Sequence, residues 1–251
     1  MTIANAMRRS EAVGRALMIS TDAETIRQVC ESMQAVAIST EVCAEAAGAI
    51  SLLNHRKFEA VVVDIGRDAK SLIERIRQSP ASRTVVIFAV IDDAFDASAT
   101  LKCGASFVMW RPLSQAHVEK LLRVAYGSIL RERRRYFRCL VRIPVVIQDS
   151  DRAAMDSTMV NIGTGGFGMD PSGPLKVGVK VRAQFNLPGN PTLFAVEATT
   201  CWCEEHYVGL QFAALSPELE SELEEWLSRK LEEGFPEEVT DKFRSAGDVQ
   251  I

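Results

Sequence analysis

The sequence has little of what most enzymes use for catalysis or metal binding. It contains three histidines among 251 residues, and these do not cluster with the six cysteines. The residue patterns of a catalytic triad, a nucleophile elbow and a phosphate-binding Walker loop are all absent. We therefore expect no catalytic residue, no metal site and no cofactor.

Long apolar runs are also missing. No run approaches the roughly 18–20 apolar residues that cross a bilayer, and the first ten residues lack the apolar stretch of a secretory signal. A hydrophobic content of 47% still supports packed cores. These features favour a soluble, cytoplasmic protein with two domains of ordinary size, in which most cysteines are reduced core residues.

In the first half, residues 15–130, short apolar runs alternate with amphipathic helical patterns. The apolar runs are typical of strands buried on both faces of a parallel sheet, and they lie at residues 16–19, 61–63, 85–88 and 107–109. Helices are predicted to begin after Asp22, to cover 69–76 and to begin again after Ser114. This alternation predicts a doubly wound α/β domain.

From Leu140 onward the apolar pattern changes to a period of two. Turn signals rich in glycine, proline and aspartate separate six candidate strands, which lie at residues 141–148, 158–162, 167–169, 179–186, 193–203 and 207–212. Six short strands at this spacing predict a closed or nearly closed antiparallel barrel. Ser216-Pro217-Glu218 then predicts the start of a C-terminal helix that ends near Gly234.

A cluster of arginines joins the two halves. Five arginines occupy the eight positions from Arg131 to Arg138, although the formal net charge of the chain is −4. A guanidinium pairs bidentately with phosphate and matches the O6/N7 edge of guanine. The glycine-rich segment Asn161–Gly166 follows, and such turns bring backbone N–H groups close to anions. Together these segments suit a small ligand that carries phosphates and guanines.

The arginine pair Arg134 and Arg138, followed by the turn with Asn161 and Gly166, resembles the signature of the PilZ family of cyclic di-GMP receptors. The resemblance covers roughly residues 131–215, including Val208–Phe212, which is similar to the last strand of the family. It implies that cyclic di-GMP, a ligand and not a cofactor, contacts seven residues: Arg133, Arg134, Arg138, Asn161, Gly163, Thr164 and Gly166.

Two positions refine this expectation. The family has serine where this chain has Gly163, so a hydroxyl that lies near the ligand phosphate is missing, and Thr164 or backbone N–H groups would have to replace it. Arg133 stands directly before the arginine pair. In the family an arginine at that position goes with a stacked pair of ligands, so the resemblance implies two ligands per domain.

The first half resembles the receiver domain of response regulators. Asp64 ends a strand where receivers carry a phosphorylated aspartate, and Cys103–Pro112 is similar to their late Gly-Ala…Lys-Pro segment, with Arg111 in place of the lysine. The acidic pair that would hold Mg²⁺ is replaced by Ser20-Thr21. Phosphoryl transfer needs such a bound cation, so we expect a pseudo-receiver that is not phosphorylated.

The resulting prediction is a non-enzymatic signalling protein that relays cyclic di-GMP binding through interdomain contacts or an unknown downstream protein, without a membrane or nucleic-acid partner. A homodimer is expected through the surface of Lys102, Arg111, His117 and Glu119. The predicted boundaries are an N-terminal segment 1–14, a pseudo-receiver 15–130, a PilZ barrel 131–215, a C-terminal helix 216–234 and a flexible tail 235–251.

Two alternatives remain open. The barrel domain could be an adaptor that no longer binds nucleotide and works through protein contacts, which the loss of the serine at Gly163 favours and the intact Arg134 and Arg138 oppose. The chain could instead be a receiver-linked DNA-binding regulator that uses its arginines on phosphates. The lack of a helix-turn-helix pattern after residue 140 and the acidic balance count against that alternative.

Overall fold

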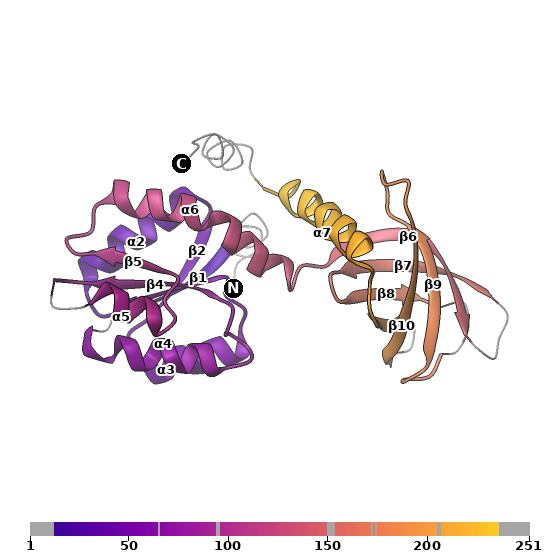
Figure 1. Ribbon diagram of the computed structural model, residues 1–251, viewed down its shortest axis with the longest axis horizontal. Helices are drawn as coiled ribbons and strands as arrows, with labels where there is room; N and C mark the ends of the chain where they lie inside the picture. Colours follow the sequence, from indigo (N-terminus) through magenta and orange to yellow (C-terminus); the bar gives the residue numbers. More distant parts are fainter. Residues whose placement is uncertain are drawn as a thin grey trace, which may run out of the picture. The chain divides into compact units, whose positions relative to one another are not determined.

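The computed structural model describes residues 13–64, 66–93, 96–149, 154–171, 173, 175–204 and 207–235. These divide into two compact units, one ending at Arg133 and one covering Arg134–Glu233 (Figure 1). Within the described residues no helix is long and apolar enough to cross a membrane. The predicted N-terminal segment lies outside the described residues except for its last two, as does the predicted tail except for Phe235.

The first unit is built on a five-stranded parallel sheet with the order β2-β1-β3-β4-β5. Its strands are β1 (Gly14–Ser20), β2 (Ile38–Cys43), β3 (Ala60–Asp64), β4 (Val86–Ile91) and β5 (Phe107–Trp110). Every residue of β4 is buried, as expected for a strand with helices on both faces of its sheet. This strand order confirms the predicted doubly wound, receiver-like fold.

Five helices cover the sheet: α2 (Ala23–Ala35), α3 (Ala46–His55), α4 (Ala69–Gln78), α5 (Ala97–Lys102) and α6 (Gln115–Arg134), with a short 3-10 helix (Gly66–Asp68) before α4. Figure 1 shows α2 and α6 on one side of the sheet and α3 and α4 on the other. The predicted helices α2, α4 and α6 are confirmed. Strand β2 and helices α3 and α5 were not predicted, because each buries only one or two residues and leaves a weak periodicity.

Helix α6 leads from the first unit into the arginine cluster. It begins after Ser114 as predicted, and the Ser114 hydroxyl oxygen accepts a hydrogen bond from the backbone N–H of His117 (3.3 Å). Its buried face repeats every three or four residues at Val118, Leu122, Ala125 and Ile129. Because the helix continues to Arg134, the first half of the arginine cluster is helical.

The second unit is a closed antiparallel barrel with the strand order β10-β11-β8-β7-β6-β9, which confirms the predicted barrel. Its strands are β6 (Cys139–Asp149), β7 (Met155–Gly163), β8 (Gly166–Asp170), β9 (Lys180–Asn186), β10 (Leu193–Glu204) and β11 (Tyr207–Phe212). Buried and exposed residues alternate strictly along β9, so the period of two read from the sequence reflects one face turned into the barrel.

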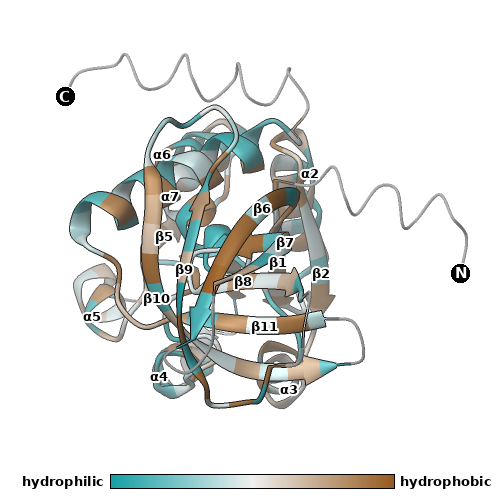
Figure 2. Ribbon diagram, turned by 90° about the vertical axis from the view of Figure 1, so that its right-hand side faces the viewer, coloured by the Kyte–Doolittle hydropathy of each residue, from teal (hydrophilic) through white to brown (hydrophobic). Residues whose placement is uncertain are grey.

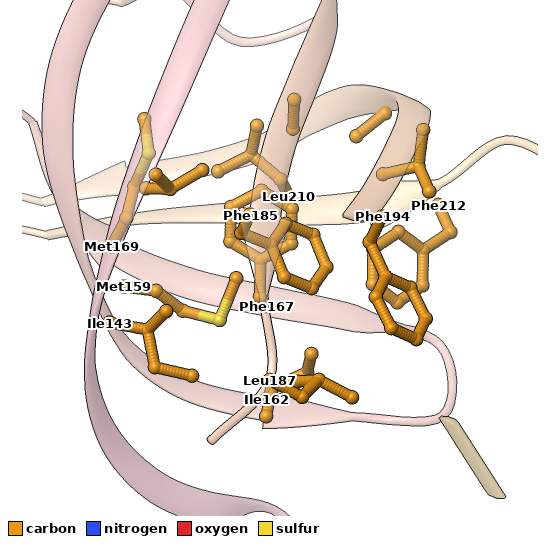
Figure 3. Packing of buried hydrophobic residues seen from close by; sticks show 14 of the residues in the cluster. Ile143, Met159, Ile162, Phe167, Met169, Phe185, Leu187, Phe194, Leu210 and Phe212 are labelled. Carbon is orange, nitrogen blue, oxygen red and sulfur yellow. The ribbon is translucent and has the colours of Figure 1, made fainter. Parts of the chain in front are cut away.

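Phenylalanine rings fill the barrel interior (Figure 3). Phe185 and Phe194 stack with their ring centroids 5.2 Å apart, and Phe167 packs against both Phe185 and Phe212 at 5.8 and 5.7 Å. Offset and tilted contacts of this kind add to the free energy of burying the rings. The barrel is therefore a packed core, and any ligand site has to lie on its surface or rim.

Helix α7 (Pro217–Glu232) extends the barrel core. It begins as predicted at Ser216, whose hydroxyl oxygen accepts a hydrogen bond from the backbone N–H of Leu219 (3.3 Å). Leu223, Trp226 and Leu227 join the core of the barrel. In Figure 2 helices α6 and α7 carry hydrophilic segments between hydrophobic ones, as expected for helices with one buried face.

Gly166 is required by the turn between β7 and β8. Its φ angle is +152°, and a Cβ atom at this position would lie 2.0 Å from the carbonyl oxygen of Leu210 on β11. No other residue type fits so close to a neighbouring strand. Gly166 therefore has a structural role in the barrel, whatever it contributes to a ligand.

Candidate functional site

Four side chains meet at the carboxyl edge of the parallel sheet in the first unit. Nη2 of Arg111 donates hydrogen bonds to both carboxylate oxygens of Asp64 (2.8 and 2.7 Å), and Nη1 of Arg111 donates to Asp22 (3.1 Å). The Ser20 hydroxyl donates to Asp64 (2.7 Å). Ligands bind at this edge in doubly wound folds, and here a guanidinium fills the space beside Asp64.

The arginine supplies the positive charge that a metal ion would otherwise bring. A hydrogen bond from the Thr25 hydroxyl, followed by one from Arg111, lowers the pKa of Asp22 to about 2. The Asp64 side chain is only 7% exposed and pairs with Arg111 at 2.7 Å, and removing one partner of such a buried pair is destabilising. Among the described residues no group of three acidic, histidine or cysteine side chains could hold a metal ion.

The second unit contains a pocket of about 490 Å³ beside the turn between β7 and β8. We call it the glycine-turn pocket. Three parts of the chain form its wall: the segment that follows α6, the turn itself, and the paired ends of β10 and β11. The lining residues are Arg135–Arg138, Gly163–Gly165, Phe167, Cys201, Trp202 and Gly209–Gln211. Arginines, backbone N–H groups and an aromatic ring thus surround one space.

Arg138 and Asn161 form the polar centre of this region. Nε of Arg138 donates a hydrogen bond to the side-chain oxygen of Asn161 (2.6 Å). The Asn161 side chain lies over Gly168, where a Cβ atom would be 2.7 Å from Asn161 Nδ2. The register of β7 and β8 shifts between Met159 and Asn161, and such bulges re-aim side chains. Partial desolvation lowers the pKa of Arg138, although a guanidinium stays charged at physiological pH.

The structure explains the glycine that replaces the family serine. A Cβ atom on Gly163 would lie 2.8 Å from the backbone carbonyl oxygen of Phe137 and 3.3 Å from Cγ of Arg138. The chain after α6 therefore passes too close to β7 for any side chain at position 163. The neighbouring Thr164 lines the pocket and brings a hydroxyl to the same turn.

The other two predicted arginines lie outside the pocket lining. Arg134 is the last residue of α6, and its Nη1 donates a hydrogen bond to the hydroxyl of Ser228 on α7. Arg133 is part of the first unit, where its positive charge lowers the pKa of Glu59 against the larger effect of burial, which raises it. Of the seven predicted residues, the structure brings five together at the pocket or its turn: Arg138, Asn161, Gly163, Thr164 and Gly166.

Trp202 is a pocket residue that the sequence did not indicate. Its side chain is 45% exposed and lies flat against Gly209 on β11, where a Cβ atom would be 2.1 Å from Nε1 of Trp202. The two residues are partners in the register of β10 and β11. Only the strand pairing reveals this contact, because nothing in the local sequence around residue 202 or 209 shows which residue faces which.

A second pocket of about 340 Å³ lies along β9 and is a weaker candidate for an anionic ligand. Lys180 and Arg182 line it, but so do the carboxylates of Asp149 and Glu197. Carboxylates oppose a phosphate, and no aromatic side chain is among the lining residues. The glycine-turn pocket combines cations with a ring, so it is the better candidate for a nucleotide.

Comparisons with known proteins give one family match. The family model described as "PilZ domain" matches residues 132–229, whereas no curated protein matches the chain. A predicted response regulator from Chloroflexus aurantiacus is 18% identical over 45% of this chain and 98% of its own, with a TM-score of 0.42.

Two further solved structures are similar at the same low level. The receiver domain of a sensor histidine kinase from Pseudomonas aeruginosa is 19% identical over 45% of this chain and 98% of its own, with a TM-score of 0.40. The Bacillus subtilis inhibitor of motility, MotI/DgrA, is 15% identical over 45% of this chain and 51% of its own, with a TM-score of 0.33.

The Arg111 contact predicts that Asp64 does not accept a phosphoryl group. Incubation with acetyl phosphate and Mg²⁺ should leave the mass of the intact protein unchanged, because Arg111 donates hydrogen bonds to both carboxylate oxygens of Asp64. Mass spectrometry tests this, with Asp64→Asn as the blank. A stable phosphate that appears on the parent protein and not on the variant would contradict the prediction.

The contact at Gly163 predicts that restoring the family serine destabilises the barrel. Gly163→Ser should cost about 1–3 kcal/mol, the usual range for overpacking, and lower the melting temperature by several degrees in calorimetry. Gly165→Ser is the matched control, because no atom lies within 4 Å of a Cβ atom at that position. Equal melting temperatures for the two variants would contradict the prediction, because they would show that the backbone near Phe137 moves to accommodate the serine without a loss of stability.

Proposed function

We propose that this chain, in which residues 132–229 form a PilZ domain, is a cytoplasmic signalling protein that binds cyclic di-GMP in the glycine-turn pocket. PilZ and receiver-like domains are regulatory and non-enzymatic, so the proposal assigns no catalytic residue. The observation that carries it is the Arg138–Asn161 pair (2.6 Å) beside a pocket that also holds a glycine turn and an exposed indole ring.

Each part of the ligand has a chemically matched group in or next to the pocket. The guanidinium of Arg138 can pair with a phosphate or with the O6/N7 edge of a guanine. The Thr164 hydroxyl and the N–H groups of the Gly163–Gly166 turn can donate to a phosphate. A guanine can stack on Trp202, and a base on an aromatic ring contributes roughly 1–3 kcal/mol.

Arg134 offers a way to relay binding. Arg134 donates a hydrogen bond to Ser228, whose own hydroxyl donates to the backbone carbonyl of Glu224 (2.6 Å). A ligand phosphate that attracted Arg134 would replace this contact with α7. We infer that binding then changes what α7 or the end of α6 offers to a downstream protein, because only a difference between the two states can carry a signal.

The adaptor without nucleotide binding is the second candidate. Two observations favour it: the backbone at Phe137 leaves no room for the family serine at position 163, and Arg134 already has a partner in Ser228. Both lower the expected affinity for a phosphate and leave the pocket itself intact. Calorimetric titration with cyclic di-GMP separates the two functions directly.

The proposal predicts that Arg138→Ala and Arg134→Ala each abolish binding measured by calorimetry. Losing hydrogen bonds from a cation to a phosphate should weaken binding by at least roughly a hundredfold. Arg142→Ala is the matched control, because Arg142 is an exposed arginine on β6 outside the pocket lining. Unchanged binding by the Arg138→Ala and Arg134→Ala variants, with melting temperatures like that of the parent, would contradict the assignment.

The expected homodimer is a separate proposal that concerns the first unit. Leu101 on α5, Trp110 at the end of β5 and Val124 on α6 are 46%, 42% and 65% exposed, and burying such apolar side chains against a second chain would be favourable. Light scattering at tens of micromolar should give the mass of two chains. The mass of one chain, with and without ligand, would contradict it.

A further inference from the structure

A buried carboxylate of the first unit lies near Ile129 on the buried face of α6. Glu59, which precedes β3, is 6% exposed, and its carboxylate accepts a hydrogen bond from the backbone N–H of Arg15 (2.5 Å). A Cβ atom on Gly14 would lie 3.3 Å from Cγ2 of Ile129 and 3.5 Å from Oε2 of Glu59. The Glu59 carboxylate and Ile129 on the buried face of α6 therefore both lie next to Gly14.

This position puts Glu59 on the same side of the helix as Arg133. Residues four apart lie on one face of an α-helix, and Arg133 follows Ile129 by one turn. Burial raises the pKa of Glu59, while the hydrogen bond from Arg15 N–H and then the positive charge of Arg133 lower it. Glu59 in turn raises the pKa of Arg133 against the lowering caused by burial.

The other cation near Glu59 has partners elsewhere. The Arg15 guanidinium lies 5.0 Å from the centroid of the Phe58 ring and forms an ion pair with Glu41 (3.6 Å). A buried carboxylate whose cation leaves is strongly destabilising. Taking Arg133 away from Glu59 therefore has a cost that a ligand must offset.

We propose that Glu59 competes with the ligand phosphate for the Arg133 guanidinium, so that the first unit weakens nucleotide binding until Arg133 is released. This inference rests on the proposed function and concerns the regulation of the same site. The guanidinium of Arg133 cannot form bidentate hydrogen bonds with the Glu59 carboxylate and with a ligand phosphate at the same time. The ligand layer that the family resemblance assigns to Arg133 should therefore bind more weakly than the layer at Arg134 and Arg138.

The test is calorimetric titration of the full chain with cyclic di-GMP in four proteins: the parent, Glu59→Gln, Arg133→Ala and the double variant. Glu59→Gln keeps the shape of the side chain and removes its charge. It should tighten overall binding by roughly tenfold, within the usual range of coupling between sites. In the Arg133→Ala background, Glu59→Gln should leave the affinity unchanged, since the guanidinium that the substitution would release is no longer present.

Glu132→Gln is the matched control. Glu132 is also a buried glutamate, 4% exposed, and accepts a hydrogen bond from the Thr84 hydroxyl (2.9 Å) that glutamine can preserve. Its replacement should leave the affinity unchanged. If Glu59→Gln does not fold, Glu59→Asp gives the same comparison with a smaller gain, because it shortens the reach toward Arg133.

Three results would overturn the inference. Equal affinities of the parent and Glu59→Gln would show that there is no competition. An equal gain in the Arg133→Ala background, or in Glu132→Gln, would show that the effect comes from loosening α6 and not from Arg133. Absence of binding in every protein would contradict the ligand assignment itself, and the competition at Glu59 with it.

Discussion

A guanidinium group is a planar cation with five N–H donors. In a folded protein, a guanidinium that is partly shielded from water donates these N–H groups to nearby oxygen acceptors of the protein. Arg111 bridges two carboxylates, Arg138 binds Asn161, and Arg134 binds Ser228. A ligand that uses one of these arginines has to replace a contact that already exists. For such a ligand the net affinity would be the difference between two sets of hydrogen bonds.

The fold of the first unit does not depend on the polar residues at the carboxyl edge of its sheet. The parallel sheet depends on buried strands such as β4, and these do not involve the polar residues at its carboxyl edge. Arginine at position 111 is a permanent cation that pairs with both Asp64 and Asp22 at this edge. The same unit ends in α6, which continues directly into the arginine cluster.

In the second unit, close approach of backbones fixes the geometry of the site. Gly163 faces the carbonyl of Phe137, Gly166 faces that of Leu210, and Gly209 supports the ring of Trp202. Each glycine lets one segment lie against another without an intervening side chain. The turn, the segment after α6 and the indole ring therefore surround one space, and the same closeness excludes the hydroxyl that the family usually places there.

The sequence by itself determined the two-unit architecture, the six barrel strands and the helix caps at Asp22, Ser114 and Ser216, because periodicity and capping are local properties of the chain. Edge strand β2 and helices α3 and α5 escaped prediction, since they bury too little to leave a pattern. Only the tertiary structure decided which acceptor each arginine binds and that Trp202 lines the pocket. Strand register and the residue at which α6 ends are set by packing between residues far apart in the chain, so the local sequence does not reveal them.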